Sequence, residues 1–272
     1  MTSFYTSLNG LRNAETDLGV VAHNIANAET TGFKRSNAQF ADIISNGSAA
    51  DPRLATGIGA TVSSINQDFS LGAIEQTGRS LDLAVDGDGF FAMRNTENNE
   101  VTFTRNGSIR VDGAGNLTDS TANRLQVFET DPAGNLISTA TTQDALVPLT
   151  NTAGDDLSGI VVDNNGVIFA SYADGTNEAV GRVAVANFFS PDGLRGIGQT
   201  KWEATGVSGA PNYTPPGNGN AGNILSGSLE RSNVDLAEEM VALITAQRNF
   251  QANARAIDTA TQISQTVINL RT

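Results

Sequence analysis

The sequence predicts an α+β fold: a mainly-β central domain flanked by N- and C-terminal helices that pair as a coiled-coil-like inner domain. All seven prolines and 25 of the 28 glycines lie between Phe33 and Ser232, so both ends of the chain are nearly free of helix breakers. Between those ends, short runs rich in β-branched and aromatic residues alternate with Gly, Asp and Asn. That alternation is typical of strands joined by tight turns.

The N-terminal end, residues 3–28, carries apolar residues at seven-residue spacing, which predicts one amphipathic helix. Its apolar face consists of Phe4, Leu11, Leu18 and Ile25 in one row, Ala14, Val21 and Ala28 in a second, and Leu8 beside them. Gly10 and Gly19 interrupt this face, and each weakens the helix by about 1 kcal/mol. Residues 30–32 predict its end.

The C-terminal end, residues 233–272, contains neither Gly nor Pro and predicts a longer helix. Ser232, followed three residues later by Asp235, fits a capping pattern and predicts where the helix begins. The apolar face consists of Leu236, Leu243, Phe250 and Ile257, an adjoining row of Met240, Ala254 and Ile268, and finally Ile263, Val267 and Leu270. A helix of this length reaches roughly 60 Å.

Two interpretations of these apolar faces stay open: the helices pair only within one monomer, or they also pack against neighbouring copies. The C-terminal helix is longer than the N-terminal one, which leaves apolar surface that its own chain does not cover. We therefore favour packing between copies.

The central region predicts strands at residues 81–85, 101–105, 159–162, 167–172 and 181–189. Three turns share one pattern, because Asp112, Asp131 and Asp163 are each followed three residues later by Gly and then by an apolar strand. Residues 204–223 hold three prolines and five glycines and predict an extended connector. The expected domains are residues 1–32 with 233–272, and a β-rich domain over 33–232 with connectors near 33–60 and 204–232.

Composition excludes several classes of function. The net charge is −13, and the 16 basic residues form no run that would bind nucleic acid or an anionic membrane. The absence of cysteine excludes thiolate metal sites, catalytic thiols and disulfides. No cleavable signal peptide and no membrane-spanning apolar stretch is recognisable.

Catalytic signals are weak, so we expect no enzyme activity, no cofactor and no metal. His23 is the only histidine, and a zinc site would need further nitrogen or sulfur ligands. Residues 217–222 match G-x-G-x-x-G, but two prolines precede them where the dinucleotide motif requires a strand. Asp86 and Glu97 have the spacing of a calcium loop, yet an apolar strand lies between them.

Both ends resemble the signatures of the flagellar rod and hook protein family. Residues 24–34, Asn-Ile-Ala-Asn-Ala-Glu-Thr-Thr-Gly-Phe-Lys, are similar to its N-terminal signature, and residues 229–235 with 247–253 are similar to its C-terminal one. The matching positions are Asn24, Asn27, Gly32, Phe33, Lys34, Ser232, Asn233, Val234, Gln247, Arg248, Asn249 and Asn253. Residues 57–59, 67–69, 77–84, 88–91 and 267–271 resemble the hook branch in particular.

The resemblance implies a structural subunit of the flagellar hook that assembles with copies of itself into a tubular helical polymer. It further implies type III export out of the cell, and contacts with the distal rod protein, the hook cap and the hook–filament junction proteins. The polymerisation residues would be Phe4, Leu8, Leu11, Leu18, Val21, Ile25, Leu236, Met240, Leu243, Phe250, Ile257, Val267 and Leu270.

Two alternatives stay open. Hook proteins usually carry an additional outer domain for which this chain has little room, so a distal or proximal rod subunit is the second interpretation. A secreted β-rich binding module or adhesin is the third, and such a module would not need paired helical ends.

Overall fold

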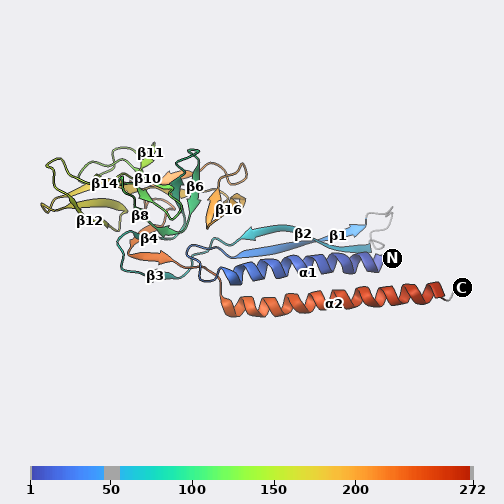
Figure 1. Ribbon diagram of the computed structural model, residues 1–272. Helices are drawn as coiled ribbons and strands as arrows, with labels where there is room; N and C mark the ends of the chain where they lie inside the picture. Colours follow the sequence, from blue (N-terminus) through green and yellow to red (C-terminus); the bar gives the residue numbers. More distant parts are fainter. Residues whose placement is uncertain (1, 46–55, 270–272) are drawn as a thin grey trace. The chain divides into compact units, whose positions relative to one another are not determined.

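The computed structural model describes residues 2–45 and 56–269, which divide into two compact units. We call Met1–Ala28, Arg35–Asp68 and Val234–Thr272 the helical unit, and Glu29–Lys34 with Phe69–Asn233 the β unit. The α+β prediction is confirmed, because a helix stands at each end of the described chain and strands fill most of the middle (Figure 1).

Helix α1 spans Thr2–Ala26 and helix α2 spans Leu236–Asn269, close to the predicted ranges. The predicted cap is one turn early. The carboxylate of Asp235, rather than the hydroxyl of Ser232, accepts the backbone N–H of Ala237 at 2.8 Å and of Glu238 at 3.2 Å. A carboxylate directly before the first helical residue is an effective N-cap. Leu270 and the end of the closing motif lie outside the described residues.

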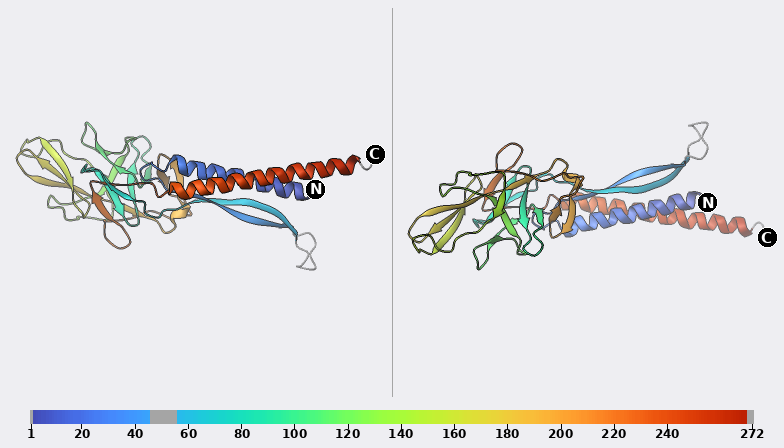
Figure 2. Two further views of the ribbon diagram at one scale, coloured as in Figure 1. Left: turned by 90° about the horizontal axis from the view of Figure 1, so that it is seen from below. Right: turned by 90° about the horizontal axis from the view of Figure 1, so that it is seen from above.

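In the helical unit, α1 and α2 lie side by side, as all three ribbon views show (Figure 2). The unit also contains an antiparallel ribbon of two strands, β1 (Ser36–Ser45) and β2 (Thr56–Gln67), which packs along α1. We expected residues 33–60 to be a connector into the β-rich domain; residues 36–45 and 56–67 are instead these paired strands. An isolated two-stranded ribbon is marginally stable in water, so its packing on α1 supports it.

The β unit is antiparallel throughout its described pairings, and its longest sheet follows the order β12-β13-β14-β10-β5-β6-β17-β16. The remaining strands form short additional pairs. The strands are β3 (Ile74–Gln76), β4 (Asp82–Asp86), β5 (Phe90–Arg94), β6 (Val101–Thr104), β7 (Gly107–Ser108), β8 (Arg110–Val111), β9 (Leu117–Thr118), β10 (Arg124–Phe128), β11 (Thr142–Asp144), β12 (Leu157–Val162), β13 (Val167–Tyr172), β14 (Asn177–Val183), β15 (Val185–Asn187), β16 (Arg195–Gly198), β17 (Lys201–Glu203), β18 (Asn212–Thr214), β19 (Asn223–Ser226) and β20 (Ser228–Glu230).

The predicted strands are confirmed, with one correction: the run 181–189 is divided at Ala184 into β14 and β15, which pair with different neighbours. The expected connector over residues 204–232 contains β18, β19 and β20, and each pairs with another strand of the β unit. The proline-rich segment therefore returns along the β unit as short strands rather than as free chain.

The three predicted Asp turns are confirmed. The Asp112 carboxylate accepts backbone N–H groups from residues 114 and 116 at 2.8 Å each, and Asp163 does the same for residues 165 and 167 at 2.9 Å. The Gly at the fourth position has positive φ, as at Gly115 (86°) and Gly166 (73°), where a side chain would be strained. These turns fix the registers of the strands that follow them.

Two apolar clusters stabilise the β unit. The larger contains Leu83, Phe91, Leu125 and Ile168, all at most 1% exposed. The smaller is aromatic, with Phe90, Phe103 and Trp202 buried and Phe69 packed edge-on against both Phe90 and Trp202. Together they give the unit a core of its own, independent of the helices.

Candidate functional site: where the two ends of the chain meet

Helices α1 and α2 run antiparallel in the helical unit, and their contact is made by small and polar residues. Gly10 lies against Asn253, and the Nδ2 of Asn24 donates to the Oε2 of Glu239 at 3.3 Å. The same register brings Asp17 level with Ala246, which is fully buried. The contact residues of α1 (10, 17 and 24) and those of α2 (239, 246 and 253) are therefore each spaced by seven, as a paired helix contact requires.

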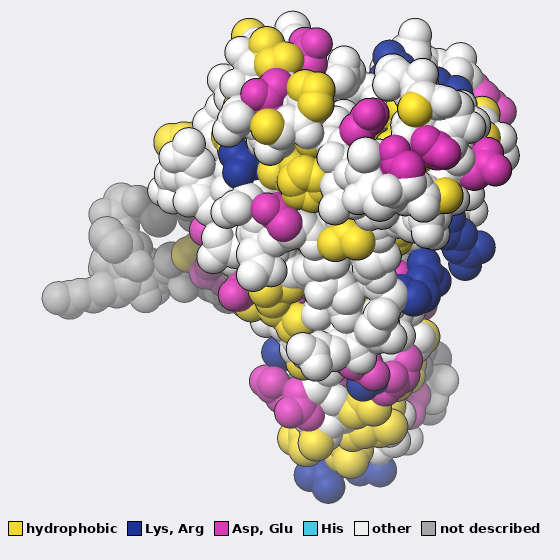
Figure 3. All heavy atoms as spheres, turned by 90° about the vertical axis from the view of Figure 1, so that its left-hand side faces the viewer, with side chains coloured by type: hydrophobic (Ala, Val, Ile, Leu, Met, Phe, Trp, Pro, Cys, Tyr) yellow, Lys and Arg dark blue, Asp and Glu magenta, His cyan; other side chains and the backbone are white. Residues whose placement is uncertain are grey.

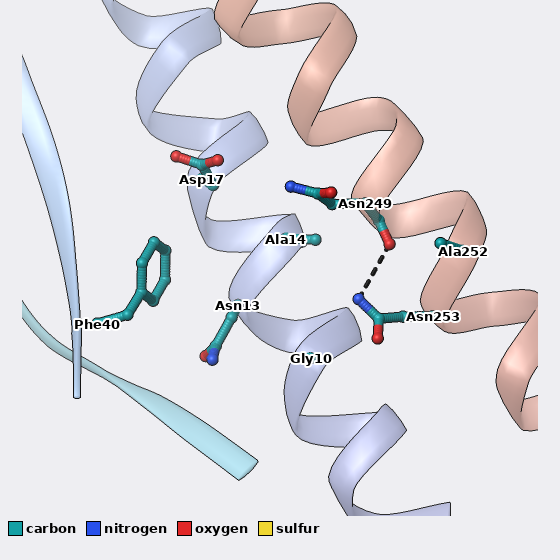
Figure 4. A pocket seen from close by; sticks show the side chains of 8 residues that line it. All are labelled: Gly10, Asn13, Ala14, Asp17, Phe40, Asn249, Ala252 and Asn253. Carbon is teal, nitrogen blue, oxygen red and sulfur yellow. Dashed lines mark hydrogen bonds between the residues drawn. The ribbon is translucent and has the colours of Figure 1, made fainter. Parts of the chain in front are cut away.

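Gly10 permits the close approach of the two helices. A Cβ built on Gly10 would lie 2.6 Å from the Oδ1 of Asn253, whereas one built on Gly19 would meet nothing within 4 Å. The close-up in Figure 4 shows Gly10 and Asn253 facing each other across the helix pair. From the sequence, both glycines weaken the helix equally; in the structure, a side chain at Gly10 would have to displace the amide of Asn253, whereas one at Gly19 would displace nothing.

Asn24 joins three segments of the helical unit. Its Nδ2 donates to the carbonyl of Ser36 at 2.9 Å, and the backbone N–H of Ser36 donates to its Oδ1 at 2.9 Å. With its bond to Glu239, the buried amide uses both its donor and acceptor groups. Arg35 completes the cluster, because its Nε lies 2.8 Å from the Oε1 of Glu239.

A second junction of the two ends lies inside the β unit. The ammonium of Lys34 donates to the Oε1 of Glu230 at 2.5 Å and to the carbonyl of Ser70 at 2.6 Å, and both charged side chains are fully buried. The other carboxylate oxygen of Glu230 lies 3.4 Å from Arg105. The backbone of Gly32 also donates to the carbonyl of Glu230 at 2.8 Å.

Arg105 is nearly as buried as its partner. Its Nη1 donates to the carbonyl of Gly87 at 2.8 Å, and its guanidinium lies 5.1 Å from the ring centre of Phe90. Burial lowers the pKa of Arg105, while the charges of Glu230 and Asp88 act in the opposite direction. The three ionised groups hold one another in a position where an unpaired charge would be strongly unfavourable.

The other motif residues divide between the junctions and the surface. Phe33 and Ser232 are buried, and Gly32 has φ 69° with the backbone N of Asn106 only 2.6 Å from where its Cβ would be. The Nδ2 of Asn233 donates to the Oγ of Ser70 at 3.1 Å. Asn27, whose Nδ2 donates to the carbonyl of His23, and Val234 are half-buried; Gln247, Arg248 and Asn249 are exposed.

Most of the predicted polymerisation residues are not fully buried by the pairing of α1 with α2. Val21 is buried, whereas Phe4 is 39%, Leu236 43% and Met240 49% exposed. The rest are half-buried: Leu8, Leu11, Leu18, Ile25, Leu243, Phe250 and Ile257. The side chain of Val267 and all of Leu270 lie outside what the structure describes.

Three further apolar side chains of α2 are also exposed: Val241 and Ile244, which the predicted apolar face omitted, and Ile263, which it included. Val241 is 65%, Ile244 50% and Ile263 60% exposed. The buried side chains of α2 are instead Ala246 and Glu239, which are 0% and 1% exposed. Sequence reasoning missed Glu239, Ala246, Glu230 and Arg105, because nothing in a single sequence distinguishes a buried charge or a seam alanine from a surface one.

Neither helix is long and apolar enough, in the part of the chain that the structure describes, to cross a membrane. The fold and these junctions define a class of protein in which the two ends of the chain together form a helical unit and a central segment forms a β unit. Each unit brings the two ends of the chain together through its own buried polar contacts.

Three family models match the chain and cover both ends and the middle. They are "Flagella basal body rod protein" on residues 4–34, "Flagellar hook protein FlgE/F/G D1 domain" on residues 84–170, and "Flagellar basal body rod FlgEFG protein C-terminal" on residues 225–270.

Full-length relatives give the same result. The flagellar basal-body rod protein FlgG of Bacillus subtilis is 33% identical over 282 residues, which covers 100% of this chain and 99% of that protein. The flagellar hook protein FlgE of Salmonella typhimurium is 26% identical over 410 residues, covering 99% of this chain and 100% of that one. The chain belongs to the flagellar hook and rod family of axial proteins, and it is a structural component of the flagellum.

Proposed function

We propose that this chain is a subunit of the flagellar hook, which polymerises through its terminal helices into a tube that couples rod to filament. One observation carries the polymerisation: α2 pairs with α1 through small and polar residues and leaves Val241, Ile244 and Ile263 at least half exposed. Large apolar side chains exposed along one helix are typical of a surface that another chain covers.

The same observation supports folding on assembly. Amphipathic helices derive most of their stability from packing, and α2 has little packing inside one copy. We therefore propose that both terminal segments are unfolded in the free monomer and become helical in the polymer. Circular dichroism of monomer and polymer at equal concentration tests this, and full helix content in the monomer would contradict it.

The hook assignment rests on the motifs in residues 57–91 and 267–271. The surface of the β unit suits a joint whose outer contacts slide, because acidic and basic side chains are mixed with neutral and apolar ones on the face in Figure 3. A polar, mixed surface of this kind favours weak contacts over tight ones.

A rod subunit is the second candidate, because a specific observation favours it. The rod relative from Bacillus subtilis aligns over 282 residues, close to the 272 of this chain, whereas the hook relative from Salmonella typhimurium needs 410 aligned positions. The hook relative thus carries segments that this chain lacks, and length alone supports the rod.

Electron microscopy separates the two. Curved tubular polymers of the purified protein, together with deletion cells whose rod carries no hook, would support the hook. Straight polymers, or deletion cells that stop before the rod is complete, would assign the chain to the rod. If the purified protein never assembles and the deletion cells still swim, both assignments are overturned.

The hook proposal also includes export through the type III apparatus and contacts with the distal rod, hook cap and junction proteins.

A further inference from the structure

A groove of about 400 Å³ runs along the helical unit between α1, α2 and β1. Figure 4 shows Asp17 and Asn13 of α1 between the Phe40 ring on one side and the amides of Asn249 and Asn253 of α2 on the other. The polar groups of this groove are thus one carboxylate and three amides, each of which offers a carbonyl-type oxygen to a donor.

Asp17 has no cationic partner in this groove. Among residues 2–45 and 56–269, no Lys, Arg or His nitrogen lies within 4.0 Å of its carboxylate, although the side chain is half-buried. Burial raises the pKa of this carboxyl, because the surroundings remove water without supplying a compensating charge. The site is therefore incomplete within a single copy.

The complementary groups lie on the outward row of α2, which we define as Val241, Arg248 and Arg255. These positions repeat every seven residues, and all three side chains are exposed. Neither arginine has a carboxylate partner among the described residues. The helical unit thus carries an unpaired carboxylate in a groove and two unpaired guanidinium groups on a separate helix face.

We propose that the groove receives an arginine from the outward row of α2 in a second copy of this chain. The guanidinium pairs with Asp17, and its remaining N–H donors bond to the oxygens of Asn13 and Asn249. Arginine suits this position because its planar fork of five donors satisfies several oxygens at once and is more weakly hydrated than an ammonium. Neighbouring Val241 is 65% exposed and covers apolar surface in the same contact.

This inference rests on the proposed polymerisation, because only a polymer brings α2 of one copy onto α1 of another. Charge complementarity favours a second copy over a different partner: the chain supplies both halves of the pair and leaves each half unpaired. The contact is head-to-tail, so it propagates rather than closing after two copies.

A charge exchange tests the pair in the full-length protein. The readout is the critical concentration for assembly, measured by sedimentation, with polymers inspected by electron microscopy. Asp17→Arg is expected to raise the critical concentration about tenfold or more, since close charge pairs couple at this scale. Whichever of Arg248 and Arg255 contacts Asp17, its replacement by Asp alone is also expected to raise the critical concentration. Combining that replacement with Asp17→Arg restores opposite charges across the contact and is expected to restore assembly.

Two controls keep the result interpretable. Glu15→Arg makes the same charge change two residues away, on an exposed side chain that does not line the groove, and is expected to change assembly little. Asp17→Asn keeps the side-chain shape, and its critical concentration is expected to depend less on salt than that of the wild type.

The outcomes distinguish this inference from the proposed function. A wild type that never polymerises would overturn the polymerisation itself. A wild type that polymerises while Asp17→Arg assembles normally, or while neither double variant recovers, would overturn the arginine pair alone. The last comparison combines Glu15→Arg with Arg248→Asp or Arg255→Asp. If this double variant assembles as well as the one that contains Asp17→Arg, the recovery reflects net charge alone, and the Asp17–arginine pair is overturned.

Discussion

Asn24 and Glu239, which lie 215 positions apart in the chain, share a 3.3 Å hydrogen bond inside the helical unit. One belongs to the N-terminal family motif and the other to the first turn of α2. Because Asn24 also forms two bonds with the backbone of Ser36, a single side chain fixes the exit of α1, the start of β1 and the position of α2.

Replacing Asn24 with Ala is expected to destabilise the helical unit by about 1–3 kcal/mol, because it leaves buried backbone groups of Ser36 without partners. The measurement is the dissociation temperature of the polymer. Asn27→Ala is the matched control, since Asn27 is more exposed and its amide bonds within α1 to the carbonyl of His23. Equal effects of the two substitutions would contradict the role given to Asn24.

The two glycines of α1 are expected to respond oppositely to Ala. Gly19→Ala should stabilise the polymer by up to about 1 kcal/mol through helix propensity, because its Cβ meets nothing. Gly10→Ala should lose that gain and more, since its Cβ meets Asn253. Adding Asn253→Ala should relieve the Gly10→Ala variant. Polymer dissociation temperatures check all three, and a Gly10→Ala variant as stable as Gly19→Ala would contradict the close approach.

The buried charge cluster is expected to decide the stability of the β unit. Glu230→Gln leaves Lys34 and Arg105 buried without their carboxylate, and a cost of about 3–5 kcal/mol is expected. Trp202 is the only tryptophan and is 2% exposed, so its fluorescence reports unfolding of this unit. Glu75→Gln is the control, because the Glu75 side chain is 61% exposed and its partner Arg231 lies 3.6 Å away at the surface.

Acid is expected to weaken the β unit through Asp144. Burial raises the pKa of this carboxyl, but hydrogen bonds from Arg94, Gln126 and Arg124 outweigh burial and the net pKa is lowered. A carboxyl whose folded pKa lies below its unfolded value, about 3.9, stabilises the fold above that value and loses this contribution as pH falls through the folded pKa.

The Trp202-reported unfolding temperature should therefore fall below about pH 4, and it should fall less steeply in Asp144→Asn. Asp163→Asn, at an exposed turn, provides the comparison variant. Parallel curves for wild type and Asp144→Asn between pH 5 and pH 2 would show that Asp144 carries no such contribution.

Both helices could be predicted from the sequence because their evidence is local. Seven-residue apolar spacing in both helices, and freedom from Gly and Pro in the C-terminal one, are properties of neighbouring residues. The cap was predicted at Ser232, one turn before Asp235, which forms it in the structure. The Asp turns were predictable for the same reason, since the carboxylate of Asp112 bonds to the backbone of its own turn. The ribbon β1–β2 was missed because its strands are stabilised by packing on α1, and no local pattern reports that contact.

The sequence by itself determined that this chain has two helical ends, a turn-rich β middle and the motifs of a flagellar axial protein, because periodicity, turn chemistry and motif order are all written along the chain. Only the tertiary structure decided which helix face pairs. The largest apolar residues of α2 predicted the seam, yet Gly10, Ala246 and the Asn24–Glu239 pair form it, because close approach rewards small side chains and satisfied polar groups. The burial of Lys34 with Glu230 was likewise decided in three dimensions, since a charge is stable inside a protein only where folding delivers its partner.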